Sequence, residues 1–290
     1  RPLPRPLPLP RLAEGGGVAA PPLITFLFFK LFLRFADNLI FNTNYGKPSE
    51  WLPYPKASSD TLGVSAAQAE TVLIAPYNNL EITSRIIDEN IKDIAGIIVE
   101  PVMRGINSQT DFLQGLRIIC DKYKTPLIFD EVITGFRVSL GGAQEYFGIT
   151  PDIAIYGKAL GNGYPITCIV GKNHIMRLKN KTFISSTFWT DRIGPTAALK
   201  TLEIMEKIQS WKIVTATGKQ IIKKWHMLRK KHDLSMSIQG IPALCNFTFG
   251  SDKNIEYKTF ITQKMLKNNF LANNIVYSSV AHTDKVLKNY

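Results

Sequence analysis

Residues 95–171 alternate short apolar runs with segments of helical periodicity, and this alternation limits the possible folds more than any other feature. The apolar runs occupy residues 96–99, 126–129 and 153–156, and each has the length of one strand. Between the first two runs, apolar side chains recur every three or four residues, as on one face of a helix. Strands that alternate with helices form parallel sheets buried on both faces, which explains why the runs are apolar throughout. The sequence therefore predicts an α/β fold with a mostly parallel sheet.

Two ionisable residues follow these runs where the strands are expected to end. Asp130 closes the run at residues 126–129, and Lys158 follows the run at residues 153–156 after one glycine. The carboxyl ends of parallel strands line the ligand crevice of an open α/β sheet, so both side chains are expected to face one bound molecule. Pyridoxal phosphate suits this pair, because it needs an amine for its aldehyde and a carboxylate beside its pyridine nitrogen. The two residues alone leave a second interpretation open, a surface-loop lysine and a helix-capping aspartate.

Length and charge limit the classes of partner. The 290 residues, 45% of them hydrophobic, are enough for one large domain or two smaller ones. The formal net charge of +12 suits nucleic acid, an anionic substrate or simply a basic surface. Lysines are frequent in the last third of the chain, but they are spread over expected helix faces without a nucleic-acid-binding motif. Because charge alone usually marks a solvated face, we expect no nucleic-acid partner.

The cysteine and histidine positions argue against a metal site. Cys120, Cys168 and Cys245 lie far apart in apolar surroundings, and the four histidines have no metal-ligand spacing. Such cysteines are expected to be buried and reduced, as in the cytoplasm. The sequence thus predicts a cytoplasmic protein without a metal ion.

Residues 1–57 differ in character from the rest of the chain. Prolines alternate with leucine and arginine at the start, and glycines and further prolines follow, a composition typical of extended or disordered chain. The apolar run at residues 23–33 is interrupted by Lys30 and is shorter than the roughly 20 residues that span a membrane. We expect a disordered N-terminal segment without a membrane span, and the alternative is a targeting segment.

The rest of the chain contains further predicted elements. Residues 72–75 have the pattern of a strand, and apolar residues between positions 87 and 94 have the spacing of a helix. Another helix is expected to begin at Pro195, since proline suits the first helical position. Residues 211–290 combine an apolar helical stripe, an alternating strand and a second helix, and they predict a smaller C-terminal α+β domain.

Three motifs resemble, in order and spacing, the successive motifs of class III aminotransferases, the fold-type I pyridoxal phosphate enzymes. They read IIVEPV at residues 97–102, LIFDEVITGFR at residues 127–137 and PDIAIYGKALGNGYPI at residues 151–166. Shorter motifs at residues 62–64, 75–81 and 186–195 are most similar to the branch of glutamate-1-semialdehyde 2,1-aminomutase and its relatives. The resemblance covers residues 58–288 and implies an aminotransferase-like large domain plus a small domain.

The resemblance implies roles for four residues of this chain. Lys158 is the lysine that forms the Schiff base with pyridoxal phosphate, and Asp130 is the partner of the pyridine nitrogen. Val132 is the apolar residue packed on one face of the ring. Thr187 matches the threonine that reaches the cofactor phosphate of the neighbouring subunit, which implies a homodimer.

Three further charged residues belong to the same motifs. Glu100 and Glu131 either shape the site or serve as structural hydrogen-bond partners. Arg137 meets either a substrate carboxylate or a neighbouring backbone, and the backbone contact is the more common role of such an arginine.

The N-terminal part departs from the family pattern. Residues 1–57 contain neither the Ser/Gly-Thr loop that holds the cofactor phosphate at a helix N-terminus nor a supported stacking aromatic residue. We therefore expect residues 58–210 to form a partial cofactor-binding large domain and residues 211–290 an incomplete small domain. The resemblance implies a transaminase or a 2,1-aminomutase acting on an amino acid or amino aldehyde, two activities that the motifs do not separate. The alternative is a catalytically incomplete fragment that remains as a structural or dimerising remnant.

Overall fold

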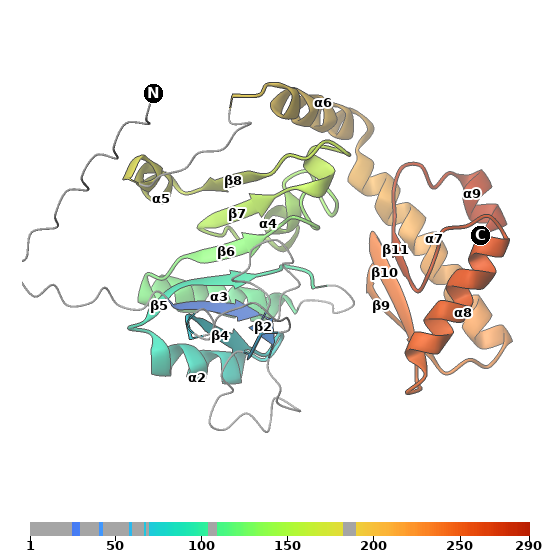
Figure 1. The fold of residues 1–290 in the computed structure, drawn as a ribbon, viewed down its shortest axis with the longest axis horizontal. Helices are drawn as coiled ribbons and strands as arrows, with labels where there is room; N and C mark the ends of the chain where they lie inside the picture. Colours follow the sequence, from blue (N-terminus) through green and yellow to red (C-terminus); the bar gives the residue numbers. More distant parts are fainter. Residues whose placement is uncertain are drawn as a thin grey trace, which may run out of the picture.

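Two β-sheets organise the part of the chain that the computed structural model describes, residues 25–29, 41–42, 58–59, 67, 70–103, 109–181 and 190–290 (Figure 1). The first sheet contains β1 (Thr25–Phe29), β4 (Val72–Ala75), β5 (Ile94–Val99), β6 (Leu127–Asp130), β7 (Ile153–Tyr156) and β8 (Cys168–Gly171). The second contains β9 (Met236–Ile241), β10 (Leu244–Phe249) and β11 (Ile275–Tyr277). A short antiparallel pair joins β2 (Phe41–Asn42) to β3 (Ser58–Ser59).

The first sheet is mostly parallel, as the sequence predicted. Its strand order is β4-β1-β5-β6-β7-β8, and only the last pair, β7 and β8, is antiparallel. The parallel neighbours β5, β6 and β7 all end at the same edge of the sheet (Figure 1). At that edge Asp130 is the last residue of β6, and Glu100 and Lys158 follow β5 and β7.

Helices α2 (Leu80–Asn90) and α3 (Thr110–Tyr123) pack against one face of this sheet (Figure 1). Their apolar faces meet the strands in one core, which includes Ile86, Ile97, Phe112, Leu116 and Phe129. Shorter elements follow along the chain, namely α4 (Gly142–Phe147), η2 (Lys158–Leu160), α5 (Asn173–Met176) and η3 (Arg177–Lys181). Helix α6 (Ile193–Ile208) then packs through Ala198 in a second cluster with residues of β7 and η2.

The C-terminal part is a smaller α+β unit. Its helices are α7 (Ser210–Lys231), α8 (Asn254–Lys267) and α9 (Asp284–Asn289), and its sheet is antiparallel (Figure 1). The predicted apolar stripe of α7 packs on this sheet, since Ile221 and Trp225 share a core with Phe247. Gly218 allows the close approach, because a side chain there would overlap the backbone carbonyl of Pro242. The residue limits given above for the domains stay a prediction.

The expectation of a disordered N-terminal segment does not hold for residues 25–29. They form β1, which lies between β4 and β5 and pairs in parallel with both. A short run of aromatic and aliphatic residues is typical of a buried strand. The expectation of disorder gave more weight to the proline-rich residues that precede this run. Most of the remaining residues in the range 1–57 lie outside the described part. Within that part, no helix combines the length and the apolar character needed to cross a bilayer.

Three local predictions need correction. The apolar spacing at residues 87–94 spans the end of α2, a turn and the first residue of β5, because periodicity alone cannot separate a helix end from a buried strand. Pro195 is the third residue of α6 instead of the first. Cys120 and Cys245 are buried, but Cys168 is exposed because it lies on the edge strand β8. The cytoplasmic location therefore stays a prediction.

Candidate active site

Asp130 is a buried carboxylate at the carboxyl end of β6. All four residues of the strand are buried, and only 4% of the Asp130 surface is exposed. The backbone N–H of Val132 donates a hydrogen bond to Asp130 Oδ1 at 3.0 Å. Burial raises the pKa of Asp130, whereas the Val132 hydrogen bond and the positive charge of Lys158 act to lower it. The ionised form of this carboxylate is thus stabilised by two neighbours.

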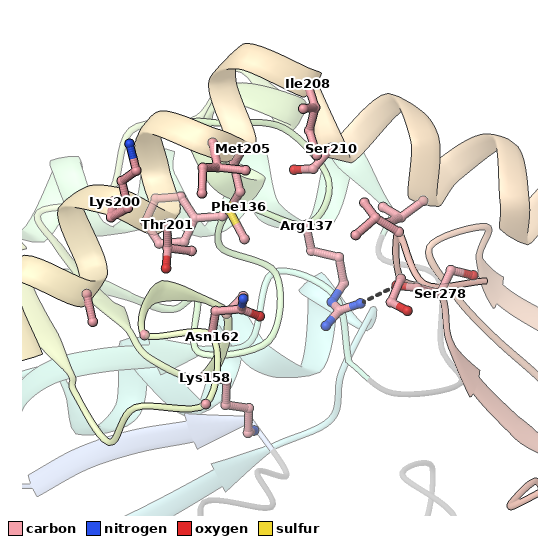
Figure 2. A pocket seen from close by; sticks show the side chains of 18 residues that line it. Phe136, Arg137, Lys158, Asn162, Lys200, Thr201, Met205, Ile208, Ser210 and Ser278 are labelled. Carbon is pink, nitrogen blue, oxygen red and sulfur yellow. Dashed lines mark hydrogen bonds between the residues drawn. The ribbon is translucent and has the colours of Figure 1, made fainter. Parts of the chain in front are cut away.

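Lys158 follows the adjacent strand, β7, and its side chain is exposed. Its backbone adopts the left-handed region, with φ of 44°, a conformation that costs a lysine about 1–3 kcal/mol. Because β6 and β7 are parallel neighbours, with Asp130 opposite Ile155, their ends bring Lys158 close enough to act on the charge of Asp130. The predicted pair of amine and carboxylate therefore lies at one sheet edge. In Figure 2 the Lys158 side chain extends below Asn162 towards the strands.

Val132 and Gly157 lie beside this pair. A Cβ atom added at Gly157 would be 3.6 Å from Val132 Cγ1 and 3.4 Å from Thr167 Cγ2, so both side chains approach the backbone next to Lys158. Val132 is partly buried, and its amide binds Asp130. The apolar side chain of Val132 thus lies between the strand ends that present Asp130 and Lys158.

Glu131 has a structural role in this geometry. Its fully buried carboxylate accepts hydrogen bonds from the amides of Ala143 and Gln144, at 2.7 and 3.0 Å, and from the Thr134 hydroxyl at 2.8 Å. The two amides belong to the first turn of α4, where backbone N–H groups lack helical partners. Burial raises the pKa of Glu131, and these hydrogen bonds oppose that effect. Glu131 therefore fixes the loop after Asp130 to α4.

Replacing Glu131 with alanine is expected to destabilise the protein by at least about 3 kcal/mol, because several buried donors lose their acceptor. The measurement is the free energy of unfolding from urea titration. Glu145→Ala is the matched control, since the Glu145 carboxylate also accepts one backbone amide, that of Gly141, but lies exposed. Equal stability of the Glu131→Ala variant and the wild type would refute the structural role.

The remaining predicted residues are placed as follows. Glu100 is buried after β5, and its backbone carbonyl accepts a hydrogen bond from the Tyr77 hydroxyl at 2.8 Å. Arg137 contacts backbone carbonyls, as the more common role predicted, with Nε donating to Ile133 and Nη1 donating to Ser278. Thr187 lies outside the described residues, so its role stays a prediction.

A cavity of about 560 Å³ adjoins Lys158. It lies between η2 and its following loop, helix α6, the first turn of α7 and the segment after β11 (Figure 2). The sequence did not single out Asn162, Ser210 or Ser278, which line this cavity together with Arg137. Asn162 stands in a glycine-rich motif after the lysine, but Ser210 and Ser278 come from distant segments and carry no local signal. They become neighbours of the site only through the packing of the C-terminal part.

The chain is similar to a large group of known proteins. A model of the family described as aminotransferase class-III matches residues 52–276. The 3-aminobutyryl-CoA aminotransferase of Cloacimonas acidaminovorans is 35% identical over 207 residues, which are 69% of this chain and 50% of that protein. The glutamate-1-semialdehyde 2,1-aminomutase of Natranaerobius thermophilus is 33% identical over 220 residues, 74% of this chain and 50% of that protein. The chain thus spans about half the length of these curated relatives.

Solved structures share the fold. The FumI protein of Sphingopyxis sp. MTA144, solved in its PLP internal aldimine form, has a TM-score of 0.78 at 23% identity, covering 91% of this chain and 62% of that one. An omega-transaminase from Sphaerobacter thermophilus has a TM-score of 0.83 at 19% identity, covering 92% of this chain and 66% of that one. At these identities the likeness concerns the fold alone.

Proposed function

The chain belongs to the class III aminotransferase family, and on this premise we propose that it binds pyridoxal phosphate and transfers amino groups, as a transaminase or a 2,1-aminomutase. The substrate of either activity is a small amino acid or amino aldehyde. The observation that carries the proposal is the placement of Asp130 and Lys158 at the ends of neighbouring parallel strands. A carboxylate and an amine at one sheet edge are the two groups that this cofactor requires.

The residues of the site fit pyridoxal phosphate. Burial raises the pKa of Asp130 while Val132 N–H and Lys158 oppose that effect, and a protonated pyridine nitrogen beside Asp130 would further favour the ionised carboxylate. Val132 offers an apolar side chain beside Gly157, where a planar ring can pack. Lys158 is exposed, and its side chain would supply the amine for the covalent bond to the cofactor's aldehyde carbon. When bound, pyridoxal phosphate supplies an electron sink for a substrate carbanion.

The chain's own residues then have distinct tasks. Lys158 would take a proton from the substrate α-carbon and return it during the transfer. Asp130 would keep the pyridine nitrogen of the bound cofactor protonated. Glu131 holds the loop between the strand end and α4, and so fixes the position of Asp130 and Val132. Glu100 is proposed only as a buried neighbour at the same sheet edge.

A homodimer is part of the same proposal, with Thr187 reaching the cofactor phosphate of the partner subunit. Large apolar side chains are exposed on β8 and α6, among them Ile169, Ile193 and Leu199, and burying them in a dimer is favourable. Sedimentation equilibrium measures the association state. A chain that stays monomeric at about 100 µM, well above the dissociation constants of stable dimers, would refute this part of the proposal.

The second candidate function is that of a chain that binds the cofactor at Lys158 but does not catalyse amino transfer. In that case the chain remains as a structural or dimerising remnant of the enzyme.

The experiment that tests the proposal follows one nitrogen atom. The purified chain is incubated with pyridoxal phosphate, ¹⁵N-labelled amino donors and unlabelled 2-oxo acids, and the products are analysed by mass spectrometry. A transaminase moves ¹⁵N to the second carbon skeleton, whereas an aminomutase moves it to the neighbouring carbon of the same skeleton. Cofactor binding without transfer would support the second candidate, and absence of cofactor binding would contradict both.

A further inference from the structure

The loop that follows Lys158 is a series of tight turns with a strained backbone. Lys158 and Asn162 both adopt the left-handed region, with φ of 44° and 46°. Within the loop, the amide of Leu160 donates to the Gly157 carbonyl at 3.0 Å, and the amide of Asn162 donates to the Lys158 carbonyl at 3.2 Å. Non-glycine residues keep such a conformation only where surrounding contacts impose it, so the position of Lys158 depends on what holds this loop.

Tyr164 joins the loop to the beginning of α6. Its hydroxyl donates a hydrogen bond to Asp191 Oδ2 at 3.0 Å, and a Cβ atom added at Gly194 would lie 3.1 Å from Tyr164 Cε1. The ring therefore packs on the first turn of α6. The Tyr164 backbone belongs to the turns, since its amide donates to the Gly161 carbonyl at 3.0 Å. One residue thus connects the loop after Lys158 to a helix.

Asp191 is itself fixed to α6. Its Oδ1 accepts a hydrogen bond from the backbone N–H of Ile193, the first residue of the helix, at 2.9 Å. The N–H groups of a first turn lack helical partners, so this bond satisfies one of them. The hydrogen bond to the Asp191 carboxylate raises the pKa of Tyr164, and the phenol therefore remains a donor at neutral pH.

Helix α6 gives this contact a firm support. Ala198 of α6 is buried and shares one apolar cluster with Tyr156 of β7 and Leu160 of η2. The strand β7 leads to the turn at Lys158, the loop leads on to Tyr164, and Tyr164 binds the start of α6, which packs back on β7 and η2. The hydrogen bond of Tyr164 therefore closes a ring of contacts around the turn at Lys158.

We propose that Tyr164 and Asp191 are positioning residues, which hold the strained turn so that the Lys158 amine stays near the charge of Asp130 and within reach of the cofactor and the substrate α-carbon. This inference rests on the proposed function, since it concerns the amine that reacts. Neither Tyr164 nor Asp191 lines the cavity beside Lys158, so they act on the reaction through Lys158. Loss of their hydrogen bond is expected to favour the relaxed turn about 2- to 10-fold.

The first test asks whether the contact holds the turn, and it needs no cofactor. Hydrogen exchange of the peptide that covers residues 158–166 is measured by mass spectrometry. We expect Tyr164→Phe to speed exchange about 2- to 10-fold. Asp191→Asn keeps an oxygen that accepts the Tyr164 hydroxyl, so its exchange should stay within about twofold of the wild type. Tyr146→Phe is the matched control, because Tyr146 is an exposed tyrosine of α4 outside this loop. Unchanged exchange in Tyr164→Phe would overturn the inference.

The second test asks whether the contact positions the Lys158 amine. The chain without cofactor is acetylated briefly with acetic anhydride, and acetylation of Lys158 is measured relative to Lys200 in the same molecules. An amine that moves away from the negative charge of Asp130 loses its proton more readily, so we expect about 2- to 10-fold faster acetylation of Lys158 in Tyr164→Phe. Tyr146→Phe should leave the ratio unchanged. Faster hydrogen exchange with an unchanged acetylation ratio would show a structural contact alone and overturn the positioning role.

A mutant cycle tests the pairing of the two residues. Asp191→Ala also removes the acceptor of the Ile193 N–H, so this variant loses more than the shared hydrogen bond. If the two residues act through one bond, adding Tyr164→Phe to Asp191→Ala changes Lys158 acetylation by less than about twofold. Independent, multiplicative effects would overturn the pairing.

Turnover supplies a separate measurement. Where the chain transfers amino groups, Tyr164→Phe is expected to lower kcat about 2- to 10-fold and to leave KM within about twofold, because the amine is displaced while the cavity is intact. A raised KM with an unchanged kcat would overturn the inference. Absence of transfer in the wild-type chain would concern only the proposed function, since the exchange and acetylation results do not depend on it.

Discussion

Replacing Lys158 with alanine is expected to lower the rate of amino transfer by about four orders of magnitude. The amine of Lys158 is proposed both to hold the cofactor and to move the proton at the substrate α-carbon. Among the described residues, Lys158 is the lysine whose positive charge lowers the pKa of Asp130. The measurement is the ¹⁵N transfer rate at saturating pyridoxal phosphate.

Lys200→Ala is the matched control for this variant. Lys200 lines the same cavity, but its ammonium is exposed and paired with Glu203, so its removal should change the rate less than about threefold. Transfer by Lys158→Ala at more than about one tenth of the wild-type rate would contradict the assignment of both tasks to Lys158.

The second large effect is expected at Asp130. The Asp130→Asn variant should lower kcat about 100- to 1000-fold, because it removes the charge that keeps the pyridine nitrogen protonated. Its amide oxygen can still accept the Val132 N–H bond, so the loop after β6 is expected to keep its conformation. The measurements are kcat and the absorbance-derived Kd for pyridoxal phosphate.

Asp130→Glu serves as the comparison, because it keeps the charge but lengthens the side chain in a buried position. We expect its kcat to lie above that of Asp130→Asn. Equal kcat values for Asp130→Asn and the wild type would show that the reaction does not use the negative charge of Asp130.

The sequence predicted the part of the site that follows from strand ends. Asp130 and Lys158 each close a short apolar run, and the rule that parallel strands end at one edge places them together. The resemblance added Val132, whose amide binds Asp130 and whose side chain lies next to Gly157. These positions depend on residues close together in the sequence or on the order of neighbouring strands, so they can be predicted from sequence patterns.

Other features depend on packing between distant segments. The strand at residues 25–29 could not be assigned to the sheet, because its partners β4 and β5 lie more than forty residues further along the chain. The hydrogen bonds of Glu131 go to α4, so the motif alone left its role open between site and structure. The Arg137 contact to Ser278 spans 141 residues, and no local pattern indicates it.

The family-model match and the motif resemblance cover slightly different ranges. The match begins at residue 52 and ends at residue 276, whereas the motifs suggested a resemblance over residues 58–288. Both ranges contain Glu100, Asp130, Lys158 and Arg137, so the assignment of these residues does not depend on either limit. Helix α6 begins two residues before the expected start at Pro195, because helix ends are weakly marked in a sequence.

The most direct test of the account is covalent mapping of the cofactor. The chain is incubated with pyridoxal phosphate, reduced with sodium borohydride, digested and analysed by mass spectrometry, with Lys158→Ala treated in parallel. We predict one phosphopyridoxyl group on Lys158 in the wild type and none on the variant at the same cofactor concentration. A group found mainly on another lysine, or equal labelling of the Lys158→Ala variant, would contradict the account.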